Sequence, residues 1–166
     1  WRSPIGRKPV VAVVVSLLAL FAAAFFYRHF FNGRALFLQI GAMMGTFMSA
    51  NVFVHIMGNQ HKFMRSLRQG LPYDPKYGKA AKFRSLHNHY MTFPVIFLML
   101  SAHFPRLYAN DWNVPVLIII ILTLMAVKYL MNSRYYFKYW LWWIFGTVFM
   151  SAHLIGIFMH LPAPGV

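Results

Sequence analysis

The side chains that could do chemistry gather in two segments on either side of one polar connection. They are Asn51, Asn59 and Gln60 around the start of the connection, and Arg84, Ser85, His87, Asn88, Tyr90 and Thr92 around its end. An arginine offers a planar fork of donors, and carboxamides both donate and accept hydrogen bonds. The set predicts a site for a small planar anion, with Arg84, His87 and Asn88 catalytic and the others substrate-binding. Satisfaction of helix ends and contact with lipid phosphates is the alternative interpretation.

Two histidines share a Ser-Ala-His context, at residues 101–103 and 151–153. Each lies about fifteen residues into an apolar stretch, so the two imidazoles are expected at about the same depth in a membrane. Two histidines at one depth on parallel helices are what a bis-histidine b-type haem requires. His103 and His153 are therefore predicted to ligate haem b, and hydrogen-bonded structural histidines are the alternative. The chain has no cysteine, so any c-type haem belongs to a partner or to a domain outside this sequence.

The composition sets the elements that must position these residues. Of 166 residues, 60% are hydrophobic and 11% are charged, and the apolar runs are long enough to cross a bilayer. The sequence predicts an all-α, polytopic membrane helix bundle that forms one domain over residues 1–166. About five transmembrane helices are expected, at 10–27, 35–57, 86–104, 114–131 and 139–159, with a basic loop at 58–84.

Local signals refine this arrangement. Gly41, Gly45 and Ser49 form a small-residue stripe that lets another helix approach closely. Residues 61–69 could form a basic amphipathic helix in the headgroup region. Because the 58–84 loop joins the second and third spans, we expect His87 and Asn88 within side-chain reach of residues 51–60.

The charge is strongly asymmetric, with 16 Lys and Arg residues against 2 acidic ones. Most of the basic residues fall in the N-terminal segment, the 58–84 loop and the 132–138 turn, which five spans would place on one side. The positive-inside rule then predicts a cytoplasmic N-terminus and a periplasmic C-terminus in a bacterial inner membrane. The same charge attracts anionic lipid, and its confinement to one face argues against nucleic acid as a partner. The basic start without an initiator Met suggests a segment of a longer chain.

Several runs resemble a known family. They are WRSPIGR at 1–7, GAMMGTFMSANVF at 41–53, NQHK at 59–62 and KFRSLHNHYMTFPVIFLMLSAH at 82–103. They resemble the membrane domain of bacterial cytochrome-c-linked urate hydroxylases, the family labelled urate oxidase N-terminal. The resemblance covers most of residues 1–132 and is most specific in the third span. The matching positions are Asn51, Asn59, Gln60, Arg84, Ser85, His87, Asn88, Tyr90, Thr92, Pro94, Ser101 and His103.

The resemblance implies the later half of a membrane domain that has helices upstream and a periplasmic c-type cytochrome domain downstream. The chain departs from the family pattern at Gly58, where proline is usual, at His89, where a smaller polar residue is usual, and at Tyr129, where histidine is usual. These departures bear on the identity of the substrate.

The leading hypothesis is a membrane oxidoreductase module that oxidises a small planar substrate and passes electrons to a periplasmic c-type cytochrome. The resemblance implies a urate-type reaction. A haem- or quinone-linked electron-transfer subunit without substrate chemistry is the second hypothesis. A cofactor-free accessory subunit of a larger membrane complex, in contact with other membrane subunits, is the third.

Overall fold

The computed structural model describes residues 9–70 and 75–162, and every regular element in these ranges is a helix. In chain order the elements are α1 (Pro9–Tyr27), α2 (Gly33–Asn51), η2 (Val52–Met57), α3 (Gly58–Arg68), α4 (Pro75–Leu100), η3 (Ser101–His103), α5 (Pro105–Tyr108), α6 (Asn113–Asn132), η4 (Ser133–Tyr135) and α7 (Trp140–His160). The predicted all-α class is therefore confirmed for the described residues.

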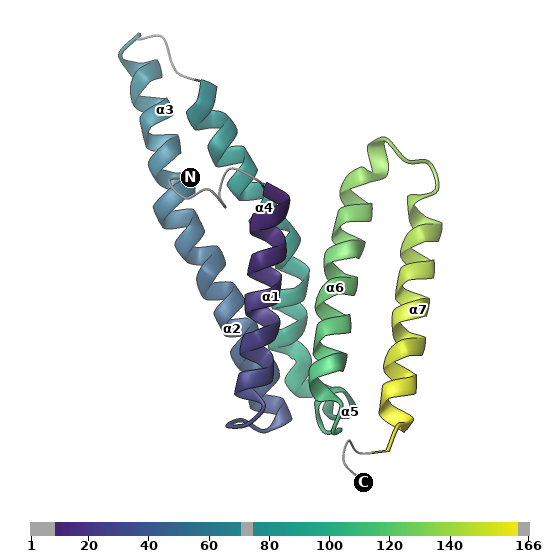
Figure 1. Ribbon diagram of the computed structural model, residues 1–166. Coiled ribbons are helices and arrows are strands. Elements are labelled where there is room, and N and C mark those ends of the chain that lie inside the picture. The colour runs from purple at the N-terminus through teal and green to yellow at the C-terminus, as the bar shows by residue number, and fades with distance from the viewer. Residues whose placement is uncertain (1–8, 71–74, 163–166) are drawn as a thin grey trace.

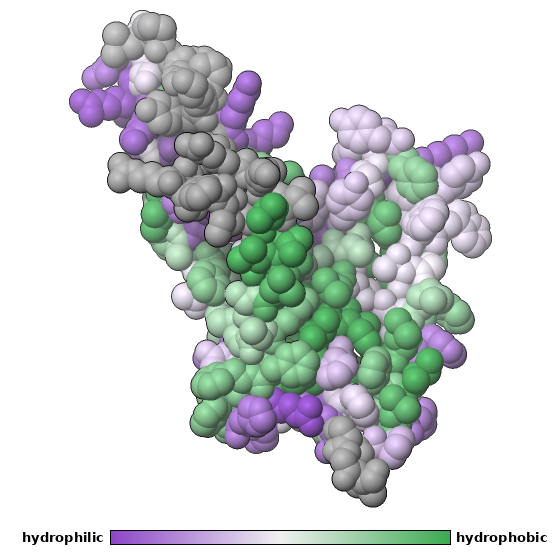
Figure 2. Space-filling view, viewed as in Figure 1, coloured by the Kyte–Doolittle hydropathy of each residue, from purple (hydrophilic) through white to green (hydrophobic). Residues whose placement is uncertain are grey.

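Three helical stretches are long and apolar enough to cross a membrane, by length and composition: Gly33–Arg68, Asn113–Tyr135 and Trp140–His160. Val13–Tyr27 is apolar but shorter. The predicted third span, 86–104, lies in the second half of α4 and η3, and it is not one of these three. Its own start is polar, with His87, Asn88 and His89 in the first turn. Figure 2 shows an apolar band across the middle of the molecule and hydrophilic side chains toward both ends.

The segment at 58–84 is a helical hairpin and not the loop expected from its polarity. The rod from Gly33 to Arg68 is continuous through a π-helical stretch at Val52–Met57, so α3 prolongs α2 and does not turn aside (Figure 1). Its 36 residues rise about 54 Å, against about 30 Å for the hydrocarbon core. Pro75 stands at the first position of α4, where its missing N–H costs nothing, and the helix runs on through Pro94. The hairpin therefore extends beyond the rest of the bundle.

The core lies where α2, α4 and α6 converge near the end opposite the hairpin (Figure 1). Phe37 and Ile40 of α2, Leu98 of α4, and Leu117 and Ile121 of α6 are buried there. Helix α1 packs on this core through residues such as Ala24, and α7 lies at the edge of the bundle beside α6. The buried core of the bundle therefore lies away from the hairpin.

The expected small-residue stripe of α2 faces α4. A Cβ on Gly41 would lie 2.9 Å from the Leu98 Cβ atom, whereas a Cβ on Gly45 would meet Val95 Cγ1 at an ordinary 3.7 Å. The stripe is therefore used for close helix packing, most tightly at Gly41.

This difference generates a stability prediction. Gly41→Ala should leave the protein less stable than Gly45→Ala by about 1–3 kcal/mol, because overpacking opposes the shared gain in helix propensity. Equilibrium unfolding in mixed micelles measures the difference. Equal stabilities of the two variants would show that the α2–α4 contact at Gly41 relaxes freely.

Candidate functional site

Two of the predicted site residues join α2 to α4 through their carboxamides. Asn51 Nδ2 donates to Asn88 Oδ1 at 2.8 Å and lies 3.2 Å from the Arg84 carbonyl oxygen. Asn88 Nδ2 donates to the Met48 carbonyl oxygen at 2.9 Å. The expected meeting of Asn88 with the 51–60 segment is confirmed, and we call this hydrogen-bonded contact the Asn51–Asn88 clamp.

The residues around the clamp are partly satisfied. Thr92 Oγ1 donates to the carbonyl oxygen of Asn88 at 3.0 Å, so its hydroxyl proton is used in a hydrogen bond within α4. Asn51 Oδ1 and Arg84 Nε are buried with no hydrogen-bond partner among the described residues. Buried polar atoms are rarely left unpaired, so each of these two calls for water or a ligand.

His87 lies on α4 beside the clamp but turns toward its own helix. Its Nδ1 lies 2.8 Å from the Phe83 carbonyl oxygen, and its ring packs edge-on against Phe83 at 4.4 Å between centroids. In the tautomer protonated on Nδ1, this contact is a hydrogen bond and Nε2 is left as an acceptor. The ring is thereby oriented, but His87 is not one of the residues that line the groove described next.

An open groove of about 560 Å³ runs between α3, α4 and the end of α6. Its lining residues are Asn59, Gln60, Phe63, Gly78, Ala81, Lys82, Ser85, Leu86, His89 and Asn132. Three predicted substrate-binding residues, Asn59, Gln60 and Ser85, meet here. Arg84, Asn88 and Asn51 lie instead at the α2–α4 contact. The predicted cluster is therefore divided between two sides of α4.

Lys82, His89 and Asn132 were missed by the sequence analysis. Gly78, Lys82, Ser85 and His89 follow one another at spacings of four, three and four, which places them on one face of a helix. Because Ser85 was a predicted substrate-binding residue, this spacing was a signal that Lys82 and His89 lie on the same helix face. No local pattern could have revealed Asn132, because it reaches the groove from a different helix.

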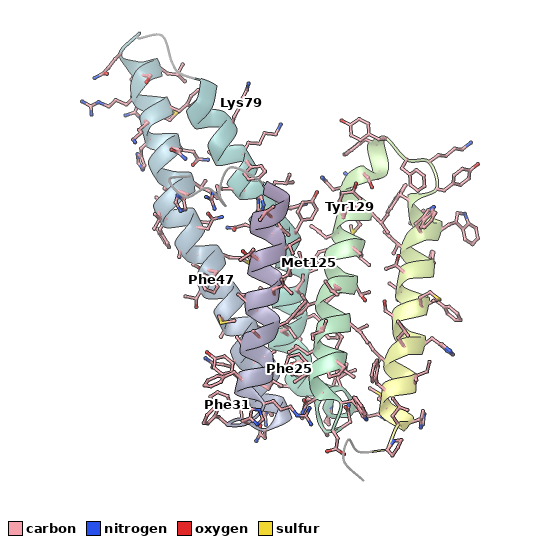
Figure 3. The ribbon with its side chains drawn as sticks, viewed as in Figure 1. Phe25, Phe31, Phe47, Lys79, Met125 and Tyr129 are labelled. Carbon is pink, nitrogen blue, oxygen red and sulfur yellow. The ribbon has the colours of Figure 1, made fainter. Side chains whose placement is uncertain are left out.

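Tyr90 acts on the groove indirectly. Asn132 Nδ2 donates to the Tyr90 hydroxyl at 3.3 Å, and the Tyr90 ring packs against Tyr129 with centroids 6.3 Å apart. Figure 3 labels Tyr129 on the upper part of α6. Tyr90 therefore ties the end of α6 to α4 and helps to hold Asn132 at the groove.

The groove suits a small planar anion. Among the described residues, its lining combines one ammonium group (Lys82), one imidazole (His89) and three carboxamides, and contains no carboxylate. Phe63 and Leu86 add apolar surface against which a flat ring can lie. Exposed cations on the hairpin, including Arg65, Arg68 and Lys79, raise the local concentration of anions (Figures 2 and 3).

The serines of the two Ser-Ala-His sequences make hydrogen bonds inside the bundle. Ser101 is buried and donates to the Leu98 carbonyl oxygen at 2.5 Å, and Ser151 lies 2.6 Å from the Thr123 hydroxyl on α6. Both serines thus face inward, whereas His103 and His153 are exposed.

The two histidines lie on elements on either side of α6 (Figure 1). His153 lines a surface hollow of about 530 Å³ on α7 together with His160, and His103 is not among its lining residues. The described residues contain no group of three or more His, Asp or Glu side chains that could hold a metal ion. These surroundings do not form a pocket for a haem held by both side chains, and the haem b pair stays a prediction.

The clamp generates a second prediction. Asn88→Ala should lower the free energy of unfolding by about 1–3 kcal/mol, because it removes both hydrogen bonds that the Asn88 carboxamide makes to α2 and takes away the Asn88 partner of Asn51 Nδ2. Ser85→Ala, one turn away in the open groove, is the matched control and should change it by less than about 0.5 kcal/mol. Unfolding in mixed micelles compares the two. Similar values for both variants would mean that the clamp adds nothing to stability.

Comparison with known proteins identifies the family of this chain. The family model described as urate oxidase N-terminal matches residues 1–159, nearly the whole chain. No curated protein matches the chain, and no solved structure does. The match includes both sides of the groove and the clamp. The chain therefore belongs to the urate oxidase N-terminal family.

Proposed function

We propose that this chain is a membrane oxidoreductase module that binds urate or a closely related planar anion in the α3–α4–α6 groove and oxidises it. Membership of a urate-related oxidoreductase family supports the substrate class. The observation that carries the proposal is the lining of the groove, where Lys82, His89 and the carboxamides of Asn59, Gln60 and Asn132 face one open space.

Each lining group has a distinct role in binding. Lys82 neutralises the charge of a urate anion, and a charge-assisted hydrogen bond is about twice as strong as a neutral one. The carboxamides match the alternating carbonyl and N–H groups of a purine edge, since each both donates and accepts. Phe63 and Leu86 cover a face of the ring.

The oxidation balances with water as the source of oxygen. Hydroxylation of the ring by one water forms a carbon–oxygen bond and releases two protons and two electrons. His89 is positioned to accept one proton, as a general base in the groove. Because the groove is proposed on the cytoplasmic side and the cytochrome in the periplasm, a redox relay on a partner subunit or on another domain has to carry the electrons across the bilayer. The c-type cytochrome is their terminal acceptor and takes them one at a time, so two reduced haem equivalents form per substrate.

The residues first assigned to catalysis take a supporting role in this proposal. The carboxamide of Asn88 is hydrogen-bonded within the clamp, and the Arg84 carbonyl oxygen accepts from Asn51 Nδ2. Together they hold α4 against α2 while a neighbouring face of α4 presents Lys82, Ser85 and His89. They are positioning residues for the groove.

The membrane arrangement belongs to the same proposal. The stretches that contain α2, α6 and α7 are long and apolar enough to cross a membrane. In this proposal, α1 and the second half of α4 are two further spans, which gives five. Asn132 ends α6, so the groove lies at the membrane surface and the basic hairpin stands beyond it. We propose a bacterial inner membrane with the hairpin in the cytoplasm, since cytoplasmic segments carry excess Lys and Arg.

A functional prediction follows for the groove. Lys82→Gln should raise KM for urate roughly 10- to 100-fold, because a charged hydrogen bond contributes about 1.5–3 kcal/mol. His89→Gln should lower kcat by roughly 10²-fold or more, as expected for loss of a general base. Reduction of cytochrome c by membranes supplied with urate measures both.

Lys79→Gln is the matched control, because Lys79 is exposed on the same helix and does not line the groove. It should keep both constants within about twofold, as expected for a solvent-exposed charge that makes no direct contact with a ligand in the groove. Equal effects at Lys79 and Lys82 would show that general surface charge, and not a contact in the groove, accounts for the change in KM. Absence of urate turnover in the wild type would favour the electron-transfer or accessory roles.

A topology prediction is independent of substrate. Alkaline phosphatase fused after His160 should be active, and the same enzyme fused in the hairpin near Gly70 should be inactive, because the enzyme folds only in the periplasm. Green fluorescent protein at the same two positions should give the opposite pattern. The reverse of these four results would invert the orientation.

A further inference from the structure

We propose that the chain holds one phospholipid headgroup beside the Asn51–Asn88 clamp, apart from the substrate groove. Arg84 binds the phosphate, and Asn51 accepts a hydrogen bond from a donor that the headgroup carries next to its phosphate. The ligand class is therefore a phospholipid with an N–H or O–H in its headgroup, namely phosphatidylethanolamine or phosphatidylglycerol. The proposal rests on the membrane placement in the proposed function and not on the substrate.

The clamp leaves one donor and one acceptor without a partner. Arg84 Nε and Asn51 Oδ1 are both buried, and neither has a hydrogen-bond partner among the described residues. The two residues touch each other, since Asn51 Nδ2 lies 3.2 Å from the Arg84 carbonyl oxygen. A ligand that satisfies both atoms has to accept one hydrogen bond and donate another.

The positive charge of Arg84 also needs an anion. The chain has two acidic residues, of which Asp74 lies outside the described residues and Asp111 lies just before α6, at the end of the bundle opposite the hairpin (Figure 1). Among the described residues, no carboxylate therefore lies near the half-buried Arg84. The side-on fork of a guanidinium, Nε–H with one Nη–H, matches two oxygens of a phosphate. The anion is thus expected from outside the chain.

In the proposed membrane, Arg84 lies at the depth of the lipid headgroups. Asn132, the last residue of α6, lies at the membrane surface and is hydrogen-bonded to Tyr90 of α4. Arg84 precedes Tyr90 by six residues, so it lies about 9 Å farther toward the hairpin. The headgroup layer is about 5–7 Å thick on each side of the hydrocarbon core, and the long arginine side chain reaches it. Lipid phosphates are therefore the anions closest to Arg84.

Apolar side chains next to Asn51 provide a surface for the acyl chains. Phe47 is 63% exposed and lies one helical turn deeper in the membrane than Asn51 (Figure 3). Phe53 and Val54, which follow Asn51 in the π-helical stretch, are 69% and 67% exposed. A lipid whose phosphate is bound at Arg84 can lay an acyl chain along Phe47.

The unpaired oxygen of Asn51 selects among headgroups. The ammonium group of phosphatidylethanolamine and the hydroxyl groups of phosphatidylglycerol can each donate to it. The trimethylammonium group of phosphatidylcholine has no N–H and cannot. Phosphatidylethanolamine and phosphatidylcholine carry the same net charge at neutral pH. A difference between these two lipids therefore reports the hydrogen bond to Asn51 and not the general attraction of a basic chain for anions.

The two lipids test the acceptor without any change to the protein. Native mass spectrometry of the purified chain in mild detergent, with either lipid added at matched acyl-chain length, measures binding. One phosphatidylethanolamine per chain should bind, and phosphatidylcholine should bind roughly 5- to 150-fold more weakly, because the buried Asn51 oxygen stays unpaired. Equal binding of the two lipids would overturn the headgroup assignment. Binding of neither would leave ordered water as the partner of the two atoms and would overturn the whole proposal.

A side-chain substitution at Arg84 tests the phosphate contact. Arg84→Gln keeps the backbone carbonyl that Asn51 uses, and it should weaken phosphatidylethanolamine binding roughly 10- to 100-fold by removing a charged hydrogen bond. Arg84→Lys keeps the charge without the fork and should recover only part of the loss. Lys79→Gln is the matched control, as an exposed cation on the same helix, and should change binding less than about twofold. Equal effects at residues 79 and 84 would contradict a site at Arg84.

Competition identifies the source of the phosphate. Soluble glycerophosphoethanolamine carries the same headgroup without acyl chains, so at equal concentration it should not displace the lipid. Displacement would assign the site to a soluble phosphodiester, and displacement by urate would assign it to the substrate. If Arg84→Gln fails to enter the membrane, the comparison of the two lipids on the unaltered chain still decides. None of these measurements uses urate turnover, so this proposal and the proposed function fail separately.

Discussion

The Asn51–Asn88 clamp is the contact on which the position of α4 depends. In the proposed bilayer setting, apolar side chains gain little by leaving lipid for one another, so close packing and polar contacts hold the helices in register. The clamp supplies the polar contact at one level, and Gly41 against Leu98 supplies close packing at another. Two fixed points on α2 and α4 leave little freedom to rotate or slide α4.

With α4 fixed against α2, an adjacent face of α4 lines the groove, which lies near the membrane surface in the proposed arrangement. Lys82, Ser85 and His89 lie there because they are a fraction of a turn away from Arg84 and Asn88. The groove also needs α3, which continues α2 through the π-helical stretch at Val52–Met57. Such stretches occur often at functional sites, and this one connects the clamp to the groove wall.

The two edges of the bundle carry different surfaces. The hairpin end is basic and hydrophilic, whereas α7 presents mostly apolar residues together with His153 and His160 (Figure 2). Asn132, at the end of α6, is the point where the helix that supports α7 also reaches the groove.

The sequence by itself determined the helical class, the apolar stretches and the contact between Asn88 and the 51–60 segment, because helix period and hydropathy are local properties. It also grouped Asn59, Gln60 and Ser85, which the structure brings together in one groove, and their role in substrate binding stays a prediction. Only the tertiary structure decided which neighbour covers each face of α4, and so separated Arg84 and Asn88 from Lys82 and His89. It alone brought Asn132 to the groove and set His103 and His153 on either side of α6, because helix–helix packing depends on contacts that no local pattern contains.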